Sequence, residues 1–185
     1  MVLSLISPVG SNFIKDWPGQ NGVNCNLIDN YAGPCLTTQP LFSYTPTFSA
    51  VTSAPTLGTG VSAILRGNYY KIFDQIYVWA EFRFGTGFAA GSGNYTMSLP
   101  FEADTSIGGD TSMGGGLLIG NGIVWDASTL ATRQPVVVSL RTTTLVQFGI
   151  RMNSGLANRN VDSGGPITWA IDDGVTFAAR YKRLP

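Results

Sequence analysis

The side chains that could exchange protons are few, and their spacing selects no catalytic pair. The chain contains no histidine, the side chain that most often acts as general acid or base near neutral pH. A glycosidase needs two carboxylates about 5 to 10 Å apart across a cleft. The candidates by residue type alone are Glu81, Glu102, Asp126 and Asp172. We therefore expect no enzymatic activity, and a glycoside hydrolase is kept only as a third alternative.

Sequence motifs for metal ions and cofactors are also missing. Cys25 and Cys35 lie ten residues apart with no histidine and no C-x-x-C spacing, so they predict no metal site. We expect two free thiols, with a disulfide as the alternative. Glu102, Asp104 and Asp110 could surround a calcium ion, but the alternating oxygen ligands of an EF-hand are absent. Without a P-loop or a G-x-S-x-G motif, no cofactor is expected.

The composition favours a protein that binds other proteins. Charged residues make up 12% of the chain, about half of the ordinary share, and 11 basic side chains balance 11 acidic ones. Neutralising phosphates needs a clustered excess of lysine and arginine, so nucleic acid is not expected as a partner. No apolar run approaches the roughly 20 residues that span a bilayer, so we expect no membrane insertion. A surface with so few charges predicts association with copies of the same chain.

Residues 1–40 differ in kind from the rest. They contain four prolines and several glycines and asparagines, and they show no strand-like alternation. We expect an irregular N-terminal arm that docks onto another protein, with Trp17 as its anchor; packing across its own domain is the equal alternative. The apolar residues expected to make these contacts are Phe13, Ile14, Trp17, Leu27, Ile28 and Tyr31.

From residue 41 the hydrophobic pattern has a period of two, which is typical of β-strands. Residues 61–72 and 76–84 predict a hairpin that turns at 73–75. One side of its second strand carries Ile76, Val78, Ala80, Phe82 and Phe84. The other side carries Tyr77, Trp79, Glu81 and Arg83, which we expect to contact a neighbouring subunit. The spacing of Glu81 and Arg83 suits a cross-strand or interchain ion pair.

The remaining residues predict further strands and two further hairpins. Single strands are expected at 43–51, 95–99 and 117–125, with a glycine-rich loop at 85–93 and a long loop at 101–116. Residues 136–152 predict one hairpin, and residues 167–181 predict another that turns at Asp173 and Gly174. About eight such strands over residues 41–185 indicate an all-β domain, an antiparallel β-sandwich of jelly-roll type. Aromatic side chains could stack on sugars at Tyr69, Tyr70, Tyr77, Trp79 and Trp125.

Several segments resemble a family of virion proteins. They are Tyr44-Thr-Pro-Thr-Phe48, Gly67-Asn-Tyr-Tyr-Lys-Ile-Phe-Asp74 leading into Ile76-Tyr-Val-Trp-Ala-Glu-Phe-Arg-Phe84, and Ser98-Leu-Pro-Phe-Glu-Ala103. Together they resemble the β-sandwich module of tail-fibre, tail-tip and head-decoration proteins of tailed bacteriophages. The segment Asp16–Ile28 is similar to the attachment segment of such proteins. In these proteins the hairpin has a pattern of the type G-x-Y-x-x-x-G. Phe73 stands where this pattern has its second glycine, so a different turn is expected there.

The resemblance implies a non-enzymatic virion structural protein that forms homotrimers and attaches to other virion proteins through its N-terminal arm. A tail, fibre or baseplate component is the first expectation. A capsid decoration or head-fibre protein is the alternative within the same class. A carbohydrate-binding module that recognises a host-surface glycan is the alternative from another class.

Overall fold

The computed structural model divides the chain into two units, residues 1–39 and residues 40–185. It describes residues 40–106, 117–128, 133–150 and 159–185, all of them in the second unit. The predicted docking residues Phe13, Ile14, Trp17, Leu27, Ile28 and Tyr31, with Cys25 and Cys35, lie outside the described residues. No helix within the described ranges has the length and apolar character needed to cross a membrane.

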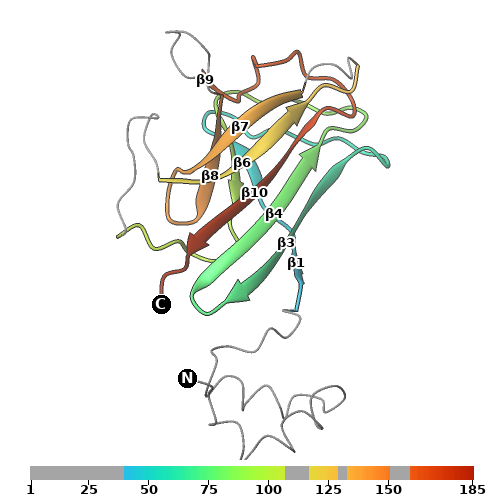
Figure 1. The fold of residues 1–185 in the computed structure, drawn as a ribbon. Coiled ribbons are helices and arrows are strands. Elements are labelled where there is room, and N and C mark those ends of the chain that lie inside the picture. Colours follow the sequence, from blue (N-terminus) through green and yellow to red (C-terminus); the bar gives the residue numbers. More distant parts are fainter. Residues whose placement is uncertain (1–39, 107–116, 129–132, 151–158) are drawn as a thin grey trace, which may run out of the picture. The chain divides into compact units, whose positions relative to one another are not determined.

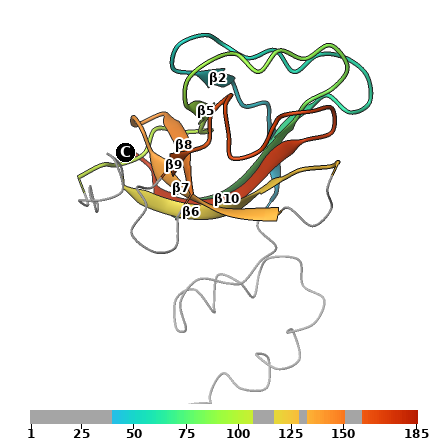
Figure 2. The same ribbon diagram turned by 90° about the horizontal axis from the view of Figure 1, so that it is seen from above.

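The described residues form one antiparallel sheet that curls around a hydrophobic core (Figures 1 and 2). Its order is β1-β3-β4-β10-β6-β7-β8-β5-β2, and β9 pairs with β8. The all-β, antiparallel prediction is confirmed. The ten strands are β1 (Phe42–Tyr44), β2 (Phe48–Ala50), β3 (Ile64–Ile72), β4 (Gln75–Arg83), β5 (Tyr95–Ser98), β6 (Leu118–Trp125), β7 (Arg133–Leu140), β8 (Leu145–Ile150), β9 (Arg159–Asn160) and β10 (Gly174–Lys182).

The predicted hairpin at residues 61–84 is confirmed as β3 and β4. Nine residue pairs join the two strands, from Ile64 opposite Arg83 to Ile72 opposite Gln75. The turn therefore has two residues, Phe73 and Asp74, and Phe73 adopts a φ of 54°. A two-residue hairpin turn commonly needs positive φ at its first position, so the phenylalanine adopts the glycine-type conformation instead of changing the turn.

The core lies on the concave side of the curled sheet. On β4 the residues expected on one side, from Ile76 to Phe84, are buried, and alternate residues of β10 are buried beside them. Aromatic rings from distant strands meet there and fix the curl, since Phe48 of β2 stacks on Phe82 of β4. The largest fully buried side chains are Tyr95, Phe82, Phe84, Phe148, Ile76, Met97, Val124, Val136, Val138, Val146, Val161 and Val175.

The strand expected at residues 43–51 is in fact two strands, so that prediction is wrong in its extent. β1 pairs with β3, whereas β2 pairs with β5 at the opposite end of the sheet path. Pro46 lies buried between them. Because proline has no backbone N–H, it cannot donate a hydrogen bond that would continue the β-ladder. The Thr-Pro-Thr segment is thus the connection by which the chain passes from one end of the sheet to the other.

Residues 51–61 and 85–94 run antiparallel as a bridged pair, although the sequence pattern predicted only a glycine-rich loop at 85–93. Three bridges join Ser53 to Ser92, Thr56 to Ala89 and Thr59 to Thr86, each spaced by three residues. Backbone hydrogen bonds run in both directions at each bridge. This spacing differs from the period of two in a strand, which is why the sequence pattern did not predict an ordered pairing.

The hairpin predicted at residues 167–181 is wrong in its first half. β10 is present, but it pairs with β4 and β6, and residues 167–171 belong to no strand. Asp173 therefore does not occupy a hairpin turn. Its buried carboxylate accepts the backbone N–H groups of Ala127 and Ala170 at 2.7 and 2.6 Å. Asp173 and Gly174 instead lead the chain into the middle of the sheet.

The other predicted strands agree with the structure. β5 and β6 lie within the ranges expected for them, and β7 and β8 form the hairpin expected at residues 136–152, of which 151 and 152 lie outside the described residues. Gly120 and Gly122 allow the backbone of β10 to approach β6, since a Cβ at either position would lie within 2.4 Å of a carbonyl oxygen of β10.

Candidate functional site

The convex side of the sheet, here called the outer face, carries the side chains that do not enter the core. Strands β3, β4, β10, β6 and β7 lie next to one another across it (Figure 1). Cross-strand pairing aligns Trp79, Ala178 and Asn121 in one row, and Glu81, Thr176 and Ile123 in the next. The outer face consists of Arg66, Asn68, Tyr70, Tyr77, Trp79, Glu81, Arg83, Thr176, Ala178, Arg180, Asn121, Ile123, Trp125, Arg133, Pro135 and Val137.

All four residues predicted to contact a neighbouring subunit lie on the outer face, but three of them already have partners within the chain. Glu81 accepts a hydrogen bond from Arg66 at 2.6 Å. Arg83 donates to the carbonyl of Ser62 at 3.1 Å and lies 3.8 Å from Asp172. A cross-strand ion pair, one of the two alternatives expected for these residues, is therefore present between Glu81 of β4 and Arg66 of β3.

Tyr77 belongs to a stacked column of cationic and aromatic groups. Its ring lies parallel to that of Tyr70 on β3 at a centroid distance of 4.7 Å and an interplanar angle of 7°. The guanidinium carbon of Arg180 lies 5.2 Å from the centre of the Tyr77 ring, within the range of a cation–π contact. Arg180 also donates to Gln75 at 3.2 Å. These contacts hold the three side chains together on the edge of the outer face.

Trp79 is the one member of the predicted set without such contacts among the described residues. Its side chain is 41% exposed, and Ile123, two strands away, is 39% exposed. Between them lies Ala178, whose single methyl group leaves a shallow hollow of about 350 Å³. Asn121 and Thr176 supply polar groups at its margin. A tryptophan and an isoleucine exposed at the centre of a sheet are typical of a surface that another molecule covers.

A second hollow lies beside the first, towards β7. It has a volume of about 300 Å³ and is lined by Ile123, Trp125, Arg133 and Thr176. Trp125 pairs with Arg133 across β6 and β7, and with Gly174 across β6 and β10. The indole N–H of Trp125 donates to the carbonyl of Asp172 at 2.8 Å, which fixes the orientation of the ring.

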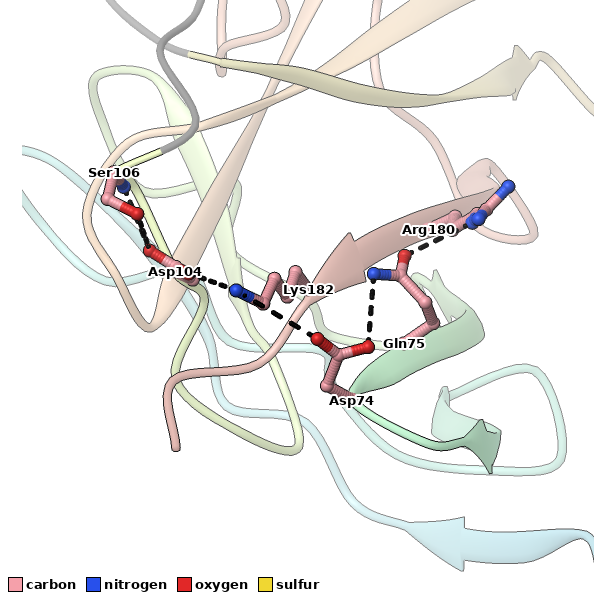
Figure 3. Close-up of polar contacts among 6 residues, drawn as sticks. All are labelled: Asp74, Gln75, Asp104, Ser106, Arg180 and Lys182. Carbon is pink, nitrogen blue, oxygen red and sulfur yellow. Dashed lines mark hydrogen bonds and ion pairs between the residues drawn. The ribbon is translucent and has the colours of Figure 1, made fainter.

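A separate polar cluster joins the end of β10 to two other segments (Figure 3). The ammonium group of Lys182 lies 3.0 Å from Asp104 and 3.9 Å from Asp74 in the β3–β4 turn. Asp104 also accepts the hydroxyl and the backbone N–H of Ser106 at 2.5 and 2.9 Å. Hydrogen bonds from Ser106 and from Lys182 lower the pKa of Asp104 to about 2, and the same ion pair raises the pKa of Lys182.

This cluster predicts a pH-dependent contribution to stability. A carboxyl group whose pKa is lowered on folding stabilises the folded state above its ordinary pKa, and the contribution is lost as the pH falls through the lowered value. Asp104→Asn should therefore reduce the free energy of unfolding at neutral pH. The difference from the wild type should shrink between about pH 4 and pH 2. Urea unfolding over this range measures it, and a difference that stays constant with pH would contradict the assignment.

Two of the carboxylates considered for acid–base chemistry lie beside arginine side chains. Glu81 is bound to Arg66, and Asp172 lies near Arg83. Burial raises the pKa of Asp173, but its two oxygens accept backbone N–H groups that connect loops. No group of three or more side chains suited to a metal ion occurs within the described ranges. Of the calcium candidates, Asp104 belongs to the Lys182 cluster and Asp110 lies outside the described residues.

Of the five aromatic residues considered for sugar stacking, four lie on the outer face. They are Tyr70, Tyr77, Trp79 and Trp125. Tyr69 instead faces the core side, where its ring contacts those of Phe42 and Phe101 at 5.3 and 5.2 Å. Its pairing with Val78, a buried residue, places Tyr69 on the core side of the sheet.

Sequence reasoning missed Arg66, Arg133 and Lys182 as members of these sites. Arg66 could have been found from the hairpin register. With a two-residue turn at Phe73 and Asp74, the residue opposite Glu81 is Arg66. Arg133 and Lys182 gave no such signal, since their neighbours come from strands distant in the sequence.

Comparisons of the chain with protein families, with curated proteins and with solved structures found no match.

Proposed function

We propose that this chain is a non-enzymatic structural subunit of a tailed-bacteriophage virion, a component of its tail, fibre or baseplate. In this proposal three copies associate through the outer face, and residues 1–40 attach the trimer to other virion proteins. The observation that carries the self-association is the exposure of Trp79 and Ile123 at the centre of the sheet. The phage assignment rests on the sequence resemblance.

The charge content supports this proposal. With 12% charged residues and no net charge, the chain has little electrostatic repulsion against close neighbours. Burying exposed apolar side chains of this kind contributes about 25 cal/mol for each Å² removed from water. Closed rings of identical subunits are a common way to cover such a surface. A capsid decoration protein would need the same surface properties and differs only in its place on the virion.

We also propose that the curled sheet is a jelly-roll-like β-sandwich. In this description β1, β3, β4, β10 and β6 form one layer, while β8, β5 and β2 fold over them. The stacking of Phe48 on Phe82, at a centroid distance of 4.0 Å, and the contact of Tyr95 with Phe82, at 5.8 Å, support it. Both join Phe82 of β4, in the first layer, to a residue of β2 or β5, in the second.

Substitution of Trp79 tests the contact surface. Trp79→Glu places a charge at the centre of the proposed interface, so we expect the trimer to dissociate to single chains at micromolar concentration. Phe73→Glu is the matched control, because Phe73 is exposed at the tip of the β3–β4 turn and lies outside the outer face. Light scattering measures the mass of each variant, and circular dichroism verifies the fold. A trimer that survives Trp79→Glu while Phe73→Glu dissociates would contradict the proposed surface.

A carbohydrate-binding module is the second candidate, favoured by the exposed indole of Trp79 beside the polar groups of Asn121 and Thr176. Under this alternative the wild type would be a monomer, and Trp79→Glu would leave its mass unchanged while abolishing binding to a glycan array. Measurements of mass and of glycan binding on the same two variants therefore separate the candidates.

A further inference from the structure

The outer face carries a projecting aromatic side chain and, two strands away, a hollow to which this side chain does not contribute. Trp79 of β4 is 41% exposed and lies at the first hollow. The second hollow, of about 300 Å³, is lined by Ile123, Trp125, Arg133 and Thr176. Because β10 separates β4 from β6, the two features lie about 10 Å apart across the strands, twice the spacing of neighbouring strands. Trp79 of the same chain therefore does not fill the second hollow, whereas Trp79 of another copy can approach it from in front of the sheet.

The walls of the second hollow suit an inserted indole ring. The hydrogen bond from the indole N–H of Trp125 to the carbonyl of Asp172, at 2.8 Å, holds one aromatic wall in a fixed orientation. Aromatic pairs prefer offset-stacked or edge-to-face contacts, and a guanidinium binds best over the face of a tryptophan. Arg133 supplies this guanidinium, and Ile123, which is 39% exposed, supplies an aliphatic contact. The volume lies at the lower limit for ligand pockets, which suits a single large side chain.

The charges of the outer face are complementary between the same two places. Glu81 is the only carboxylate among the described residues of this face, and it follows Trp79 by two residues on the same side of β4. Its Oε1 atom accepts a hydrogen bond from Arg66 at 2.6 Å, whereas Oε2 accepts none from a described residue. Arg133 is exposed and has no partner among the described residues, while the other three arginines of this face are paired within the chain. A copy that inserts Trp79 therefore also brings a carboxylate oxygen towards an unpaired guanidinium.

We propose that the subunits of the trimer associate head to tail across the outer face. Trp79 of one copy inserts into the second hollow of the next copy, and Glu81 beside it forms an ion pair with Arg133 of that copy. Each copy gives its Trp79 to one neighbour and its hollow to the other, so three such contacts close a ring and leave neither part unused. This inference rests on the trimer proposed above, and it adds the residues that each side contributes and the direction of the contact.

Reversal of the charge at the hollow is the first part of the test. Arg133→Glu brings two carboxylates together at every contact, so we expect the trimer to dissociate to single chains at micromolar concentration. Arg141→Glu is the matched control, because Arg141 is also exposed but lies in the β7–β8 turn, and this variant should remain a trimer. Light scattering measures the mass of each variant, and circular dichroism verifies that it is folded.

A mixture of two variants tests the direction of the contact. Trp79→Glu lacks the inserted side chain but keeps the hollow, whereas Arg133→Glu lacks the charge of the hollow but keeps Trp79. One intact contact can form between the two chains, and the ring cannot close. We therefore expect a species of twice the 19.7 kDa chain mass in the mixture, while each variant alone remains a single chain. Sedimentation equilibrium at about 100 µM is the measurement, because one open contact binds more weakly than a closed ring.

The outcomes separate this inference from the proposed function. A wild-type trimer together with an Arg133→Glu trimer would overturn the head-to-tail contact alone, and so would a mixture of folded variants that contains only single chains. A wild type with the mass of two chains would overturn the ring, because two copies related by a two-fold axis exchange both parts at once. A wild type with the mass of one chain would overturn the proposed trimer together with this inference.

Discussion

Replacing Phe48 with alanine is expected to destabilise the domain by about 3–5 kcal/mol, the usual cost of removing a buried aromatic ring. Phe48 is only 9% exposed, and its ring stacks on Phe82 of β4 at 4.0 Å and meets Tyr95 of β5 at 5.1 Å. Because β2 has three residues, this ring provides much of its attachment to the core. Urea unfolding followed by circular dichroism measures the loss.

Phe42→Ala is the matched control for this prediction. Phe42 lies on β1, at the opposite end of the sheet path, and it is 45% exposed with its ring stacked on Tyr69 at 5.3 Å. Its removal should cost about 1 kcal/mol. Equal losses for the two variants would mean that β2 does not pack against β4, and the curl of the sheet would then be wrong.

Gly91→Ala is expected to cost at least about 2 kcal/mol, because two unfavourable effects act together. Gly91 has a φ of +67°, a conformation that costs an alanine about 1–2 kcal/mol. A Cβ there would also lie 2.4 Å from the carbonyl oxygen of Ser53, on the opposite side of the bridged pair of residues 51–61 and 85–94. The two segments would have to separate to accommodate it. The free energy of unfolding in urea measures the cost.

Gly87→Ala separates the two effects. Gly87 has a similar φ of +71°, but nothing lies within 4 Å of the position of its Cβ. This variant should lose only the conformational part, about 1 kcal/mol. If Gly91→Ala and Gly87→Ala lost the same stability, the close approach of the two segments would be contradicted.

Local sequence patterns predicted the strands whose partners follow directly along the chain. In the β3–β4 and β7–β8 hairpins, alternation of polar and apolar residues is unbroken and the connections are short, so both faces and partners followed from the sequence. Burial of Phe82 and exposure of Trp79 could be read from the same alternation. Alternation therefore predicts the buried face of a strand reliably where the strand's partner is its neighbour in a hairpin.

Pairing between distant segments could not be predicted in this way. The insertion of β10 between β4 and β6 depends on the whole sheet, and a local signal, Asp173 next to Gly174, pointed to a hairpin instead. The carboxylate of Asp173 is used for backbone hydrogen bonds that no spacing rule reveals. Pro46 is a local indication that the segment divides into β1 and β2. No local feature indicates that β2 then pairs with β5.

The candidate site was predictable only in part. Alternation along β4 placed Tyr77, Trp79, Glu81 and Arg83 on one face. Their actual neighbours on β10, β6 and β7 come from residues 40 or more positions later in the chain, so neither hollow could be anticipated. The same holds for the cluster of Asp104 and Lys182, which joins a loop to the end of the last strand.

The central claim is that the outer face associates copies of this chain. The measurement that tests it most directly is the mass of the purified full-length protein at micromolar concentration, determined by light scattering coupled to size-exclusion chromatography. The proposal predicts a single species of three times the 19.7 kDa chain mass. A species with the mass of one chain would contradict it and would leave the exposed Trp79 as part of a ligand-binding surface.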